Sequence, residues 1–257
     1  MYKFIIPSYK RPLIIKDKTL TLLKSLGVSI DEIEIVVEND AMKEEYLAVL
    51  GEMYRYNIVV SNTYGIQGKR NFIREYYQFQ TDYDYIICID DDIDQLYNWD
   101  TPITPSEFRD MIEDAFIKCE LEGLRMWGVS PFHNTFYMKK YDTSSLKYIC
   151  GAFFGLIIDR DYAPILTDFN HYEDFDFTCS HFLRDKGVLR KNYISIKTKY
   201  FNPNGGITEW YGGKEQRKVA QEQDALRFVS KYPGMAKIIK KNYGTDLRLN
   251  HNFKITQ

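Results

Sequence analysis

The chain of 257 residues has only four cysteines and four histidines, and no apolar run as long as a membrane-spanning helix needs. Cys88, Cys119, Cys150 and Cys179 lie about thirty residues apart among apolar and aromatic neighbours. We therefore expect buried free thiols, and neither a disulfide framework nor a zinc site. The first residues, Met-Tyr-Lys-Phe-Ile-Ile, are typical of a strand and not of a signal peptide. These absences indicate a folded cytoplasmic protein without a membrane partner.

Two common phosphate-binding motifs are also absent. The segment Gly65-Ile66-Gln67-Gly68-Lys69-Arg70-Asn71 has its glycines too close for GxxxxGK[ST], no Ser or Thr follows the lysine, and no GxGxxG fingerprint occurs. The sequence therefore argues against P-loop and dinucleotide-binding proteins. The same segment still suits an anionic ligand, because glycines admit close backbone approach and the two cations lie near a helix start.

The charge is unevenly distributed, although the formal net charge is only −2. Residues 184–257 contain 16 Lys and Arg against 6 Asp and Glu, a net of +10, whereas residues 1–183 contain 18 against 30, a net of −12. This asymmetry indicates either a polyanionic partner or a set of solvated lysine-rich helices. We expect one continuous domain with a core at 1–183 and a basic segment at 184–257 packed on it.

Strand and helix patterns alternate four times in the first 95 residues. Strands are expected at 2–6, 33–37, 57–61 and 83–89, and helices at 19–26, 41–50 and 71–77, the last opened by a glycine-containing loop at 65–69. This alternation predicts βαβ units and a parallel sheet. A helix from Thr104, strands at 128–137 and 146–159, and a basic helix at 214–231 follow. The predicted fold class is α/β, with a mixed, mostly parallel sheet flanked by helices and a basic helical C-terminal part.

Three adjacent acids, Asp90, Asp91 and Asp92, follow the apolar strand that ends at Ile89. Ligands of open α/β sheets collect at the carboxyl ends of the strands. Three neighbouring carboxylates repel one another unless a cation neutralises them, and all-oxygen ligands favour Mg²⁺ or Mn²⁺. The sequence therefore predicts a metal site here; the alternative is an acidic turn that caps a helix.

A second acidic cluster, Glu173-Asp174-Phe175-Asp176, lies about eighty residues further on, after the apolar, glycine-containing segment 151–158. A carboxylate near the metal site, but outside it, suits a general base that deprotonates an acceptor hydroxyl. The alternative is a helix N-terminus whose acids complement the helix dipole.

Taken together, Ile5–Pro12, Gly65–Asn71 and Ile89–Ile93 stand in the order, and near the spacing, of the GT-A nucleotide-sugar glycosyltransferases. They most resemble the DNA-base glycosyltransferases of phages and related elements that are associated with TET/JBP oxygenases. The resemblance covers residues 1–95 and extends to 151–176. It implies a Rossmann-like fold and transfer of a sugar from a UDP-linked donor to a 5-hydroxymethylated pyrimidine, above all 5-hydroxymethylcytosine, in double-stranded DNA. The cytoplasm would be that of the host if a phage encodes the chain.

The resemblance also implies roles for individual residues. Asp92 and Asp90 match the outer acids of the family's DxD motif and would hold Mn²⁺ or Mg²⁺, with Asp90 also near the donor ribose. Asp174 matches the base of the family's ED motif, with Glu173 and Asp176 as rivals. Asp91 most resembles a residue that secures the loop. The implied donor-binding set is Pro7, Ser8, Tyr9, Arg11, Gly65, Lys69, Arg70, Asn71, Asp90 and Asp91.

Three further points stay open. Many relatives supply a late histidine to the metal, but His133, His181 and His251 stand in no matching context. The aromatic side chains Phe201, Trp210 and Tyr211 could stack on a flipped base or anchor a loop. The alternatives to the DNA-base enzyme are a glycosyltransferase acting on a polysaccharide or protein, a nucleotidyltransferase, and a noncatalytic nucleic-acid-binding module.

Overall fold

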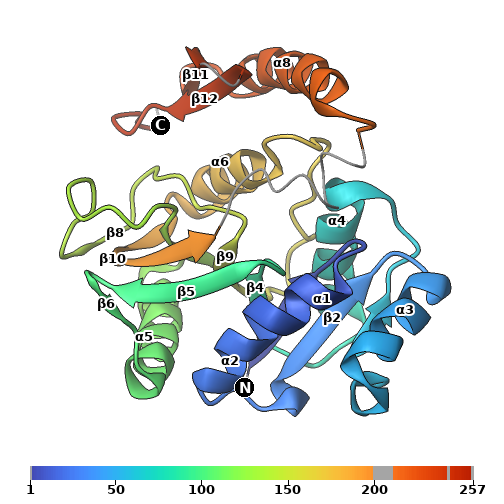
Figure 1. The fold of residues 1–257 in the computed structure, drawn as a ribbon. Helices are drawn as coiled ribbons and strands as arrows, with labels where there is room; N and C mark the ends of the chain where they lie inside the picture. The colour runs from blue at the N-terminus through green and yellow to red at the C-terminus, as the bar shows by residue number, and fades with distance from the viewer. Residues whose placement is uncertain (1, 199–210, 242–243, 256–257) are drawn as a thin grey trace.

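The computed structural model describes residues 2–198, 211–241 and 244–255, which form a mixed β-sheet covered by helices on both faces (Figure 1). Phe201 and Trp210 lie outside the described residues. The order of the strands in the sheet is β3-β2-β1-β4-β9-β7-β10-β5-β6, and β8 pairs with β10. The strands are β1 (Tyr2–Pro7), β2 (Ile33–Val37), β3 (Ile58–Val60), β4 (Tyr85–Ile89), β5 (Ile93–Asn98), β6 (Thr101–Pro102), β7 (Met126–Ser130), β8 (Asp142–Thr143), β9 (Phe153–Ile157) and β10 (Leu189–Thr198).

The first four strands are parallel, as the alternation of strand and helix patterns predicts. Phe4 of β1 lies opposite Ile33 of β2 on one side and Ile87 of β4 on the other, so β1 is an inner strand, and it is buried from Phe4 to Pro7. The sheet becomes mixed at β9, which pairs antiparallel with both β4 and β7. The predicted fold class, α/β with a mixed and mostly parallel sheet, is confirmed.

Helices cover the sheet in two sets, each with its own apolar cluster. One cluster contains Leu23, Tyr46 and Phe108, and the other contains Tyr77 and Phe177 on the opposite face. The helices are α1 (Pro12–Ile15), the π-helical turn η1 (Lys16–Leu20), α2 (Thr21–Ser25), the 3₁₀ turns η2 (Ile30–Glu32) and η3 (Glu52–Tyr54), α3 (Asp40–Leu50), α4 (Gly65–Phe79), α5 (Pro105–Glu122), α6 (Glu173–Asp185) and α8 (Lys214–Lys231).

The C-terminal part forms a layer of its own over α6, made of α8 and the hairpin β11 (Ala236–Lys241) and β12 (Gly244–Leu249) (Figure 1). Phe228 of α8 packs on Phe169 and Phe175, with ring centroids 5.7 and 6.1 Å apart. The chain between residues 184 and 257 also supplies β10 to the main sheet. The basic segment therefore shares the sheet with the rest of the chain, and contains a hairpin beside the predicted helix.

Several local expectations need correction. The segment 65–69 is the first part of α4 and not a loop, since the helix starts at Gly65. Within it, Gly68 packs directly against Thr63. The strands expected at 128–137 and 146–159 are shorter, and form β7 and β9. The expected free thiols are confirmed: Cys88, Cys119, Cys150 and Cys179 are all buried and unpaired. Among the described helices, none has the length and apolar character that a membrane crossing requires.

The close contact of β7 with β9 yields a stability prediction. Gly155 lies opposite Trp127, and a Cβ added to Gly155 would meet the indole ring at 2.2 Å. Because overpacking a buried site costs about 1–3 kcal/mol, we expect Gly155→Ala to lower the free energy of unfolding by about 2 kcal/mol in urea titrations. The loss should shrink when Trp127→Leu is present as well; an equal loss in both backgrounds would contradict the proposed clash.

Candidate active site

The acidic turn 90–92 is fixed from both sides through its backbone. The amide of Asp90 donates to the carbonyl of Ala152 (2.9 Å), just before β9. The hydroxyl of Thr19, in η1, donates to the carbonyl of Asp90 (2.7 Å) and accepts from the amide of Ile93 (3.0 Å). The turn therefore connects β4 to β5 in a defined position at the carboxyl end of β4.

Asp91 points inward, beneath the loop that follows β1. Its carboxylate accepts from the hydroxyl of Ser8 (2.5 Å) and from Nη1 of Arg11 (3.2 Å). Burial raises the pKa of Asp91, against the effect of the Arg11 charge and the Ser8 hydrogen bond. Ser8 is also hydrogen-bonded to the hydroxyl of Tyr46 (2.5 Å). Asp91 thus connects the turn to the loop Pro7–Arg11.

Asp90 and Asp92 lie on the more open side of the turn. Asp90 accepts from Nη2 of Arg70 (2.8 Å) and keeps 36% of its side chain exposed. Asp92 accepts from the hydroxyl of Thr198 (2.9 Å) and from Nη1 of Arg11 (3.3 Å). Burial raises the pKa of Asp90 to about 7; Arg70 opposes the shift, and the charges of the neighbouring acids add to it.

Lys69 lies under the Pro7–Arg11 loop. Its Nζ is 3.8 Å from the carboxylate of Glu38 and 4.9 Å from the centroid of the Tyr9 ring. Burial lowers the pKa of Lys69, although Glu38 and Asp91 favour its charged form. The lysine therefore contributes a positive charge behind the loop, where only 2% of it is exposed.

Arg70 brings the two acidic clusters together. Its Nη2 donates both to Asp90 and to the carbonyl of Gly151 (2.7 Å). A Cβ placed on Gly151 would lie 3.4 Å from Cβ of Asp174, and 3.5 Å from both Nη2 of Arg70 and Oε1 of Glu173. Nε and Nη1 of Arg70 are buried without a hydrogen-bond partner in the described part of the chain. The end of β4, the start of β9 and the start of α6 therefore meet around one guanidinium group.

Asp174 is the most firmly oriented acid of the second cluster. Its carboxylate accepts from the amides of Gly151 (3.2 Å) and Phe175 (2.9 Å) and from the hydroxyl of Tyr148. Burial raises the pKa of Asp174 against these hydrogen bonds. Burial also raises the pKa of Glu173, and the adjacent Asp174 charge adds to the shift. Both carboxyls hold protons at a higher pH than ordinary acids.

Asp176 and Asn71 bind partners outside this cluster. Asp176 is fully buried on the side of α6 that faces α8, where the Tyr232 hydroxyl (2.6 Å) and Nζ of Lys231 (2.9 Å) bind it. The amide of Asn71 pairs with the backbone of Thr167, which it holds through bonds of 2.8 and 2.9 Å. Gly65 starts α4 with a φ of +70°.

The histidines also have other partners. His181 is buried between Arg74 and Asp185, His251 is hydrogen-bonded to the carbonyl of Leu146 (2.9 Å), and His133 stacks on Tyr97. In the described ranges, no three acidic, histidine or cysteine side chains converge as a ready-made metal site.

The donor set nevertheless suits a hard divalent cation. Asp90 and Asp92 offer carboxylate oxygens, and Mg²⁺ is usually held by one or two carboxylates, with phosphates and water completing its shell. Asp90, Glu173 and Asp174 surround Arg70, so the acids outnumber this guanidinium group. Burial is the main reason that the pKa of Asp90 is raised, and a bound cation would offset both the burial and the smaller repulsion from Asp91 and Asp92.

Four residues of this arrangement were missed in the sequence: Thr19, Tyr46, Tyr148 and Thr198. Each contributes a single hydroxyl from an element that is distant in sequence, and no local pattern identifies such a contact. The importance of Gly151 could be recognised in the sequence, because a glycine at the start of an apolar strand indicates that another group approaches the backbone closely there.

The raised pKa of Glu173 yields a pH prediction. The native state keeps this proton at a pH where the unfolded chain has lost it, so the free energy of unfolding should fall as the pH rises from 5 to 8. Glu173→Gln should flatten this dependence and be more stable than the wild type at pH 8, by about 1 kcal/mol. Denaturant titrations across this range measure the effect. Glu75→Gln, at an exposed position of α4, is the control, and parallel curves for wild type and Glu173→Gln would contradict the prediction.

Comparison by sequence finds no relative: no protein-family model and no curated protein matches the chain. Comparison by structure finds sugar-transferring enzymes. TarS 1-349 from S. aureus in complex with UDP-GlcNAc superposes with a TM-score of 0.52 at 18% identity, over 89% of this chain and 66% of that one. The chain thus spans slightly less than two thirds of this TarS fragment.

Two other enzymes superpose similarly. Mannosyltransferase PcManGT from Pyrobaculum calidifontis, in complex with GDP-Man and Mn²⁺, gives a TM-score of 0.52 at 13% identity, over 88% of this chain and 64% of that one. Glucosyl-3-phosphoglycerate synthase from Mycobacterium tuberculosis, with Mg²⁺ and UDP, gives 0.51 at 10% identity, over 98% of this chain and 87% of that one. At these identities the likeness concerns the fold, and the chain has the GT-A fold of nucleotide-sugar glycosyltransferases.

Proposed function

We propose that the protein is a metal-dependent glycosyltransferase that moves a sugar from a nucleotide sugar, UDP-linked, to an acceptor hydroxyl. The observation that carries the proposal is the convergence of Asp90, Arg70, Glu173 and Asp174 around Gly151, at the carboxyl end of β4 in a GT-A fold. Three neighbours with this fold were solved with nucleotides or nucleotide sugars, two of them with Mn²⁺ or Mg²⁺.

The donor would lie against the carboxyl edge of the parallel strands. Pro7, Ser8, Tyr9 and Arg11 form the loop that follows β1, which we assign to the nucleoside. Asp92 and Asp90 would hold Mn²⁺ or Mg²⁺, which as a Lewis acid stabilises the charge that develops on the departing diphosphate. Lys69 and Arg70 place positive charge behind the same site.

We assign the general base to Asp174. The Tyr148 hydroxyl and the Gly151 amide fix the orientation of its carboxylate, and burial raises its pKa, which makes it a stronger base than an ordinary carboxylate. Glu173 lies on the same side, with its pKa raised as well, and remains the rival. We assign Asp176 to the packing of α6 on α8, since Lys231 and Tyr232 bind it there.

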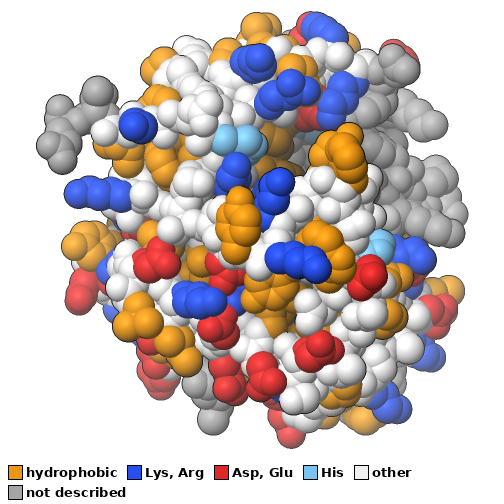
Figure 2. All heavy atoms as spheres, turned by 90° about the vertical axis from the view of Figure 1, so that its left-hand side faces the viewer, with side chains coloured by type: hydrophobic (Ala, Val, Ile, Leu, Met, Phe, Trp, Pro, Cys, Tyr) orange, Lys and Arg blue, Asp and Glu red, His pale blue; other side chains and the backbone are white. Residues whose placement is uncertain are grey.

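For the acceptor, we propose a 5-hydroxymethylpyrimidine in double-stranded DNA, most simply 5-hydroxymethylcytosine. Residues 1–183 would bind the donor, and 184–257 would attract the DNA backbone. Figure 2 supports the charge separation: Lys and Arg side chains gather on the upper part of the face, and Asp and Glu side chains below. On the hairpin, Lys237 lies directly opposite Arg248, both are exposed, and neither has an acidic partner among the described residues. Facing like charges destabilise a hairpin unless an anion lies against them.

One observation favours a polysaccharide or protein acceptor instead. Several cations of the C-terminal part are already paired: Lys231 with Asp168, Lys240 with Glu222, and Lys241 with Asp246. These pairs reduce the field that DNA would meet. A nucleotidyltransferase or a noncatalytic nucleic-acid-binding module would share the acids or the charge, but would not transfer a sugar.

Sugar transfer can be tested directly. Duplex DNA containing 5-hydroxymethylcytosine is incubated with the protein, Mn²⁺ and a panel of nucleotide sugars, and the nucleosides are analysed by mass spectrometry. We expect a mass gain of one sugar, and rates about 10²–10⁴-fold lower for Asp174→Asn because a general base contributes that much. Asp92→Asn should also be inactive, whereas Asp94→Asn, an acid that follows the turn and pairs with Lys18, should keep its activity.

Release of free nucleotide without acceptor is measured in the same reactions. One outcome is that the enzyme hydrolyses a nucleotide sugar slowly, in a reaction that depends on Asp92, without adding any mass to the DNA. This result would exclude DNA as the acceptor and would still support a glycosyltransferase. No use of any donor would overturn the proposed function itself.

The hairpin yields a separate prediction for DNA binding. If Lys237 and Arg248 contact phosphates, Lys237→Ala/Arg248→Ala should weaken binding to duplex DNA and reduce the slope of log K against log salt by up to about 1.8, since each contact contributes about 0.9. Fluorescence anisotropy at several salt concentrations measures this slope. Lys16→Ala/Lys24→Ala removes the same charge from η1 and α2 and serves as the control. An equal loss in both variants would show that the hairpin is not the DNA contact.

A further inference from the structure

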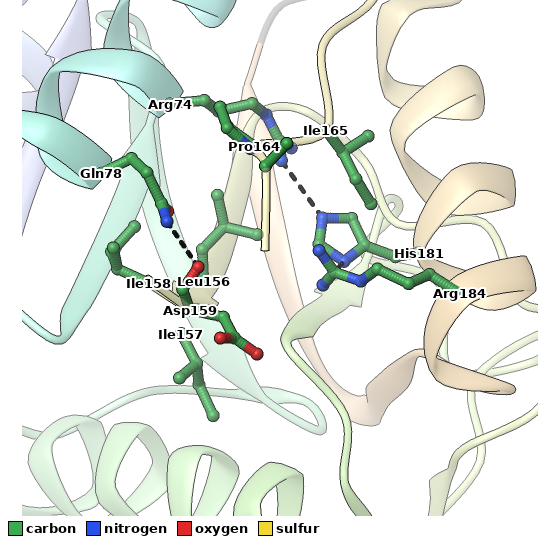
Figure 3. A pocket seen from close by; sticks show the side chains of 11 residues that line it. Arg74, Gln78, Leu156, Ile157, Ile158, Asp159, Pro164, Ile165, His181 and Arg184 are labelled. Atoms are coloured by element: carbon green, nitrogen blue, oxygen red, sulfur yellow. Dashed lines mark hydrogen bonds between the residues drawn. The ribbon is translucent and has the colours of Figure 1, made fainter. Parts of the chain in front are cut away.

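A small cavity lies at the opposite edge of the sheet from the acidic turn. Because β9 runs antiparallel to β4, its last residue, Ile157, pairs with Tyr85 at the start of β4, whereas Asp90 follows the other end of that strand. The cavity has a volume of about 30 Å³ and is lined by the second half of α4, the end of β9, residues 163–165 and the second half of α6 (Figure 3). It lies between the far ends of α4, β9 and α6, whose other ends form the acid cluster.

Arg74 is the residue that makes this cavity unusual. Only 5% of it is exposed, and its guanidinium carbon lies 3.4 Å from the centroid of the Phe177 ring. Nη1 donates to Nε2 of His181 (3.1 Å), and Nη2 is buried without a hydrogen-bond partner in the described ranges. No described carboxylate lies within ion-pair distance of Arg74, although it is a cavity-lining cation that stays charged at neutral pH.

His181 does not balance this charge. Its Nε2 accepts from Arg74, which assigns the ring proton to Nδ1, and Nδ1 donates to Asp185 (3.2 Å). Burial lowers the pKa of His181 to about 3, with the Arg74 and Arg184 charges adding to the shift, so the ring is neutral near pH 7. A neutral ring leaves the guanidinium charge uncompensated.

The nearby carboxylates are bound by other cations. Asp185 accepts from Nε and Nη2 of Arg184 (2.6 and 3.0 Å). Asp159 lines the cavity, but its carboxylate binds Arg125 at 2.6 Å. Asp176, which lies one turn before His181 on α6, is held by Lys231 at 2.9 Å. Each of these acids has its own cation, so the cavity carries the full charge of Arg74.

A buried cation without a counter-ion is strongly unfavourable. A cavity of about 30 Å³ exceeds the roughly 10–15 Å³ that one water molecule needs, so it has room for a water molecule or a small ion. Water would satisfy Nη2 but would not neutralise the charge. We propose that the cavity binds one small monovalent inorganic anion of the halide class, held by Arg74 and Arg184 between α4 and α6.

The position of this anion would give it a structural effect. Arg70 precedes Arg74 by one turn of α4, and α6 begins with Glu173 and Asp174 and ends near Arg184. An ion between the second halves of the two helices therefore stabilises the same helix pair whose first halves meet around Gly151. The anion site itself does not depend on the proposed sugar transfer.

The test uses the full chain and chloride as the probe. Thermal unfolding is followed at constant ionic strength while sodium gluconate is replaced by sodium chloride. We expect a saturating rise of the midpoint by about 2–4 °C, the shift that a modest ligand gives to a chain of this size. Arg74→Gln should abolish the rise. Arg190→Gln, which changes another largely buried arginine away from the cavity, should preserve it.

A second measurement does not require a variant to fold. Crystals of the wild type grown or soaked in bromide should show an anomalous peak between Arg74 and Arg184. Equal midpoints in chloride and gluconate, or an undiminished chloride effect in Arg74→Gln, would overturn the proposal. A bromide-free cavity would do the same, as would stabilisation by phosphate or sulfate alone, because a site for a small monovalent anion must respond to chloride.

Discussion

The region that we propose as the active site depends on the ion pair between Arg70 and Asp90, together with the bond from Arg70 to the carbonyl of Gly151. One nitrogen atom joins the end of β4 to the start of β9, and the first turn of α6 packs beside it. Arg70 is buried and Asp90 is partly exposed, so removal of Asp90 would leave the buried guanidinium charge without its carboxylate partner. The acidic turn, the glycine and the second acidic pair therefore form one unit, which explains why three elements far apart in the sequence meet at a single point.

The mixed sheet makes this meeting geometrically possible. Parallel βαβ units alone place ligand-binding loops at the carboxyl ends of successive strands. Here β9 runs antiparallel to β4, so the start of β9, and α6 after it, reach the same edge. The three acids of the turn then have different neighbours: Asp91 is buried against Ser8 and Arg11, whereas Asp90 and Asp92 face the open side. In the proposed site, Asp91 would hold the turn in place, whereas Asp90 and Asp92 would be the acids that face the ligand.

The sequence predicted the elements whose patterns are local. Residues 33–37 and 214–231 form the expected strand and helix, and the capping box of Thr104 and Glu107 starts α5 as expected. It did not predict β10, because Lys191 breaks the apolar pattern of a strand. This lysine is fully buried and neutralised by Asp114 and Asp142, which come from α5 and β8. The contact of Asn71 was not predicted for the same reason: its partner, the backbone of Thr167, is almost a hundred residues away.

The helices α4 and α6 carry opposite charge imbalances at their two ends. Near Gly151, Asp90, Glu173 and Asp174 outnumber Arg70, and burial raises the pKa of each; the charges of Asp174 and Asp90 add to the shift of Glu173. One turn after Arg70 on α4, Arg74 is buried without a carboxylate partner among the described residues. Each imbalance alone would push the helix pair apart or draw in solvent, because unpaired charges are costly in a low-dielectric interior. A cation at one edge of the sheet and an anion at the other would neutralise both, so packing of this helix pair and ligand binding at its two ends are parts of the same electrostatic balance.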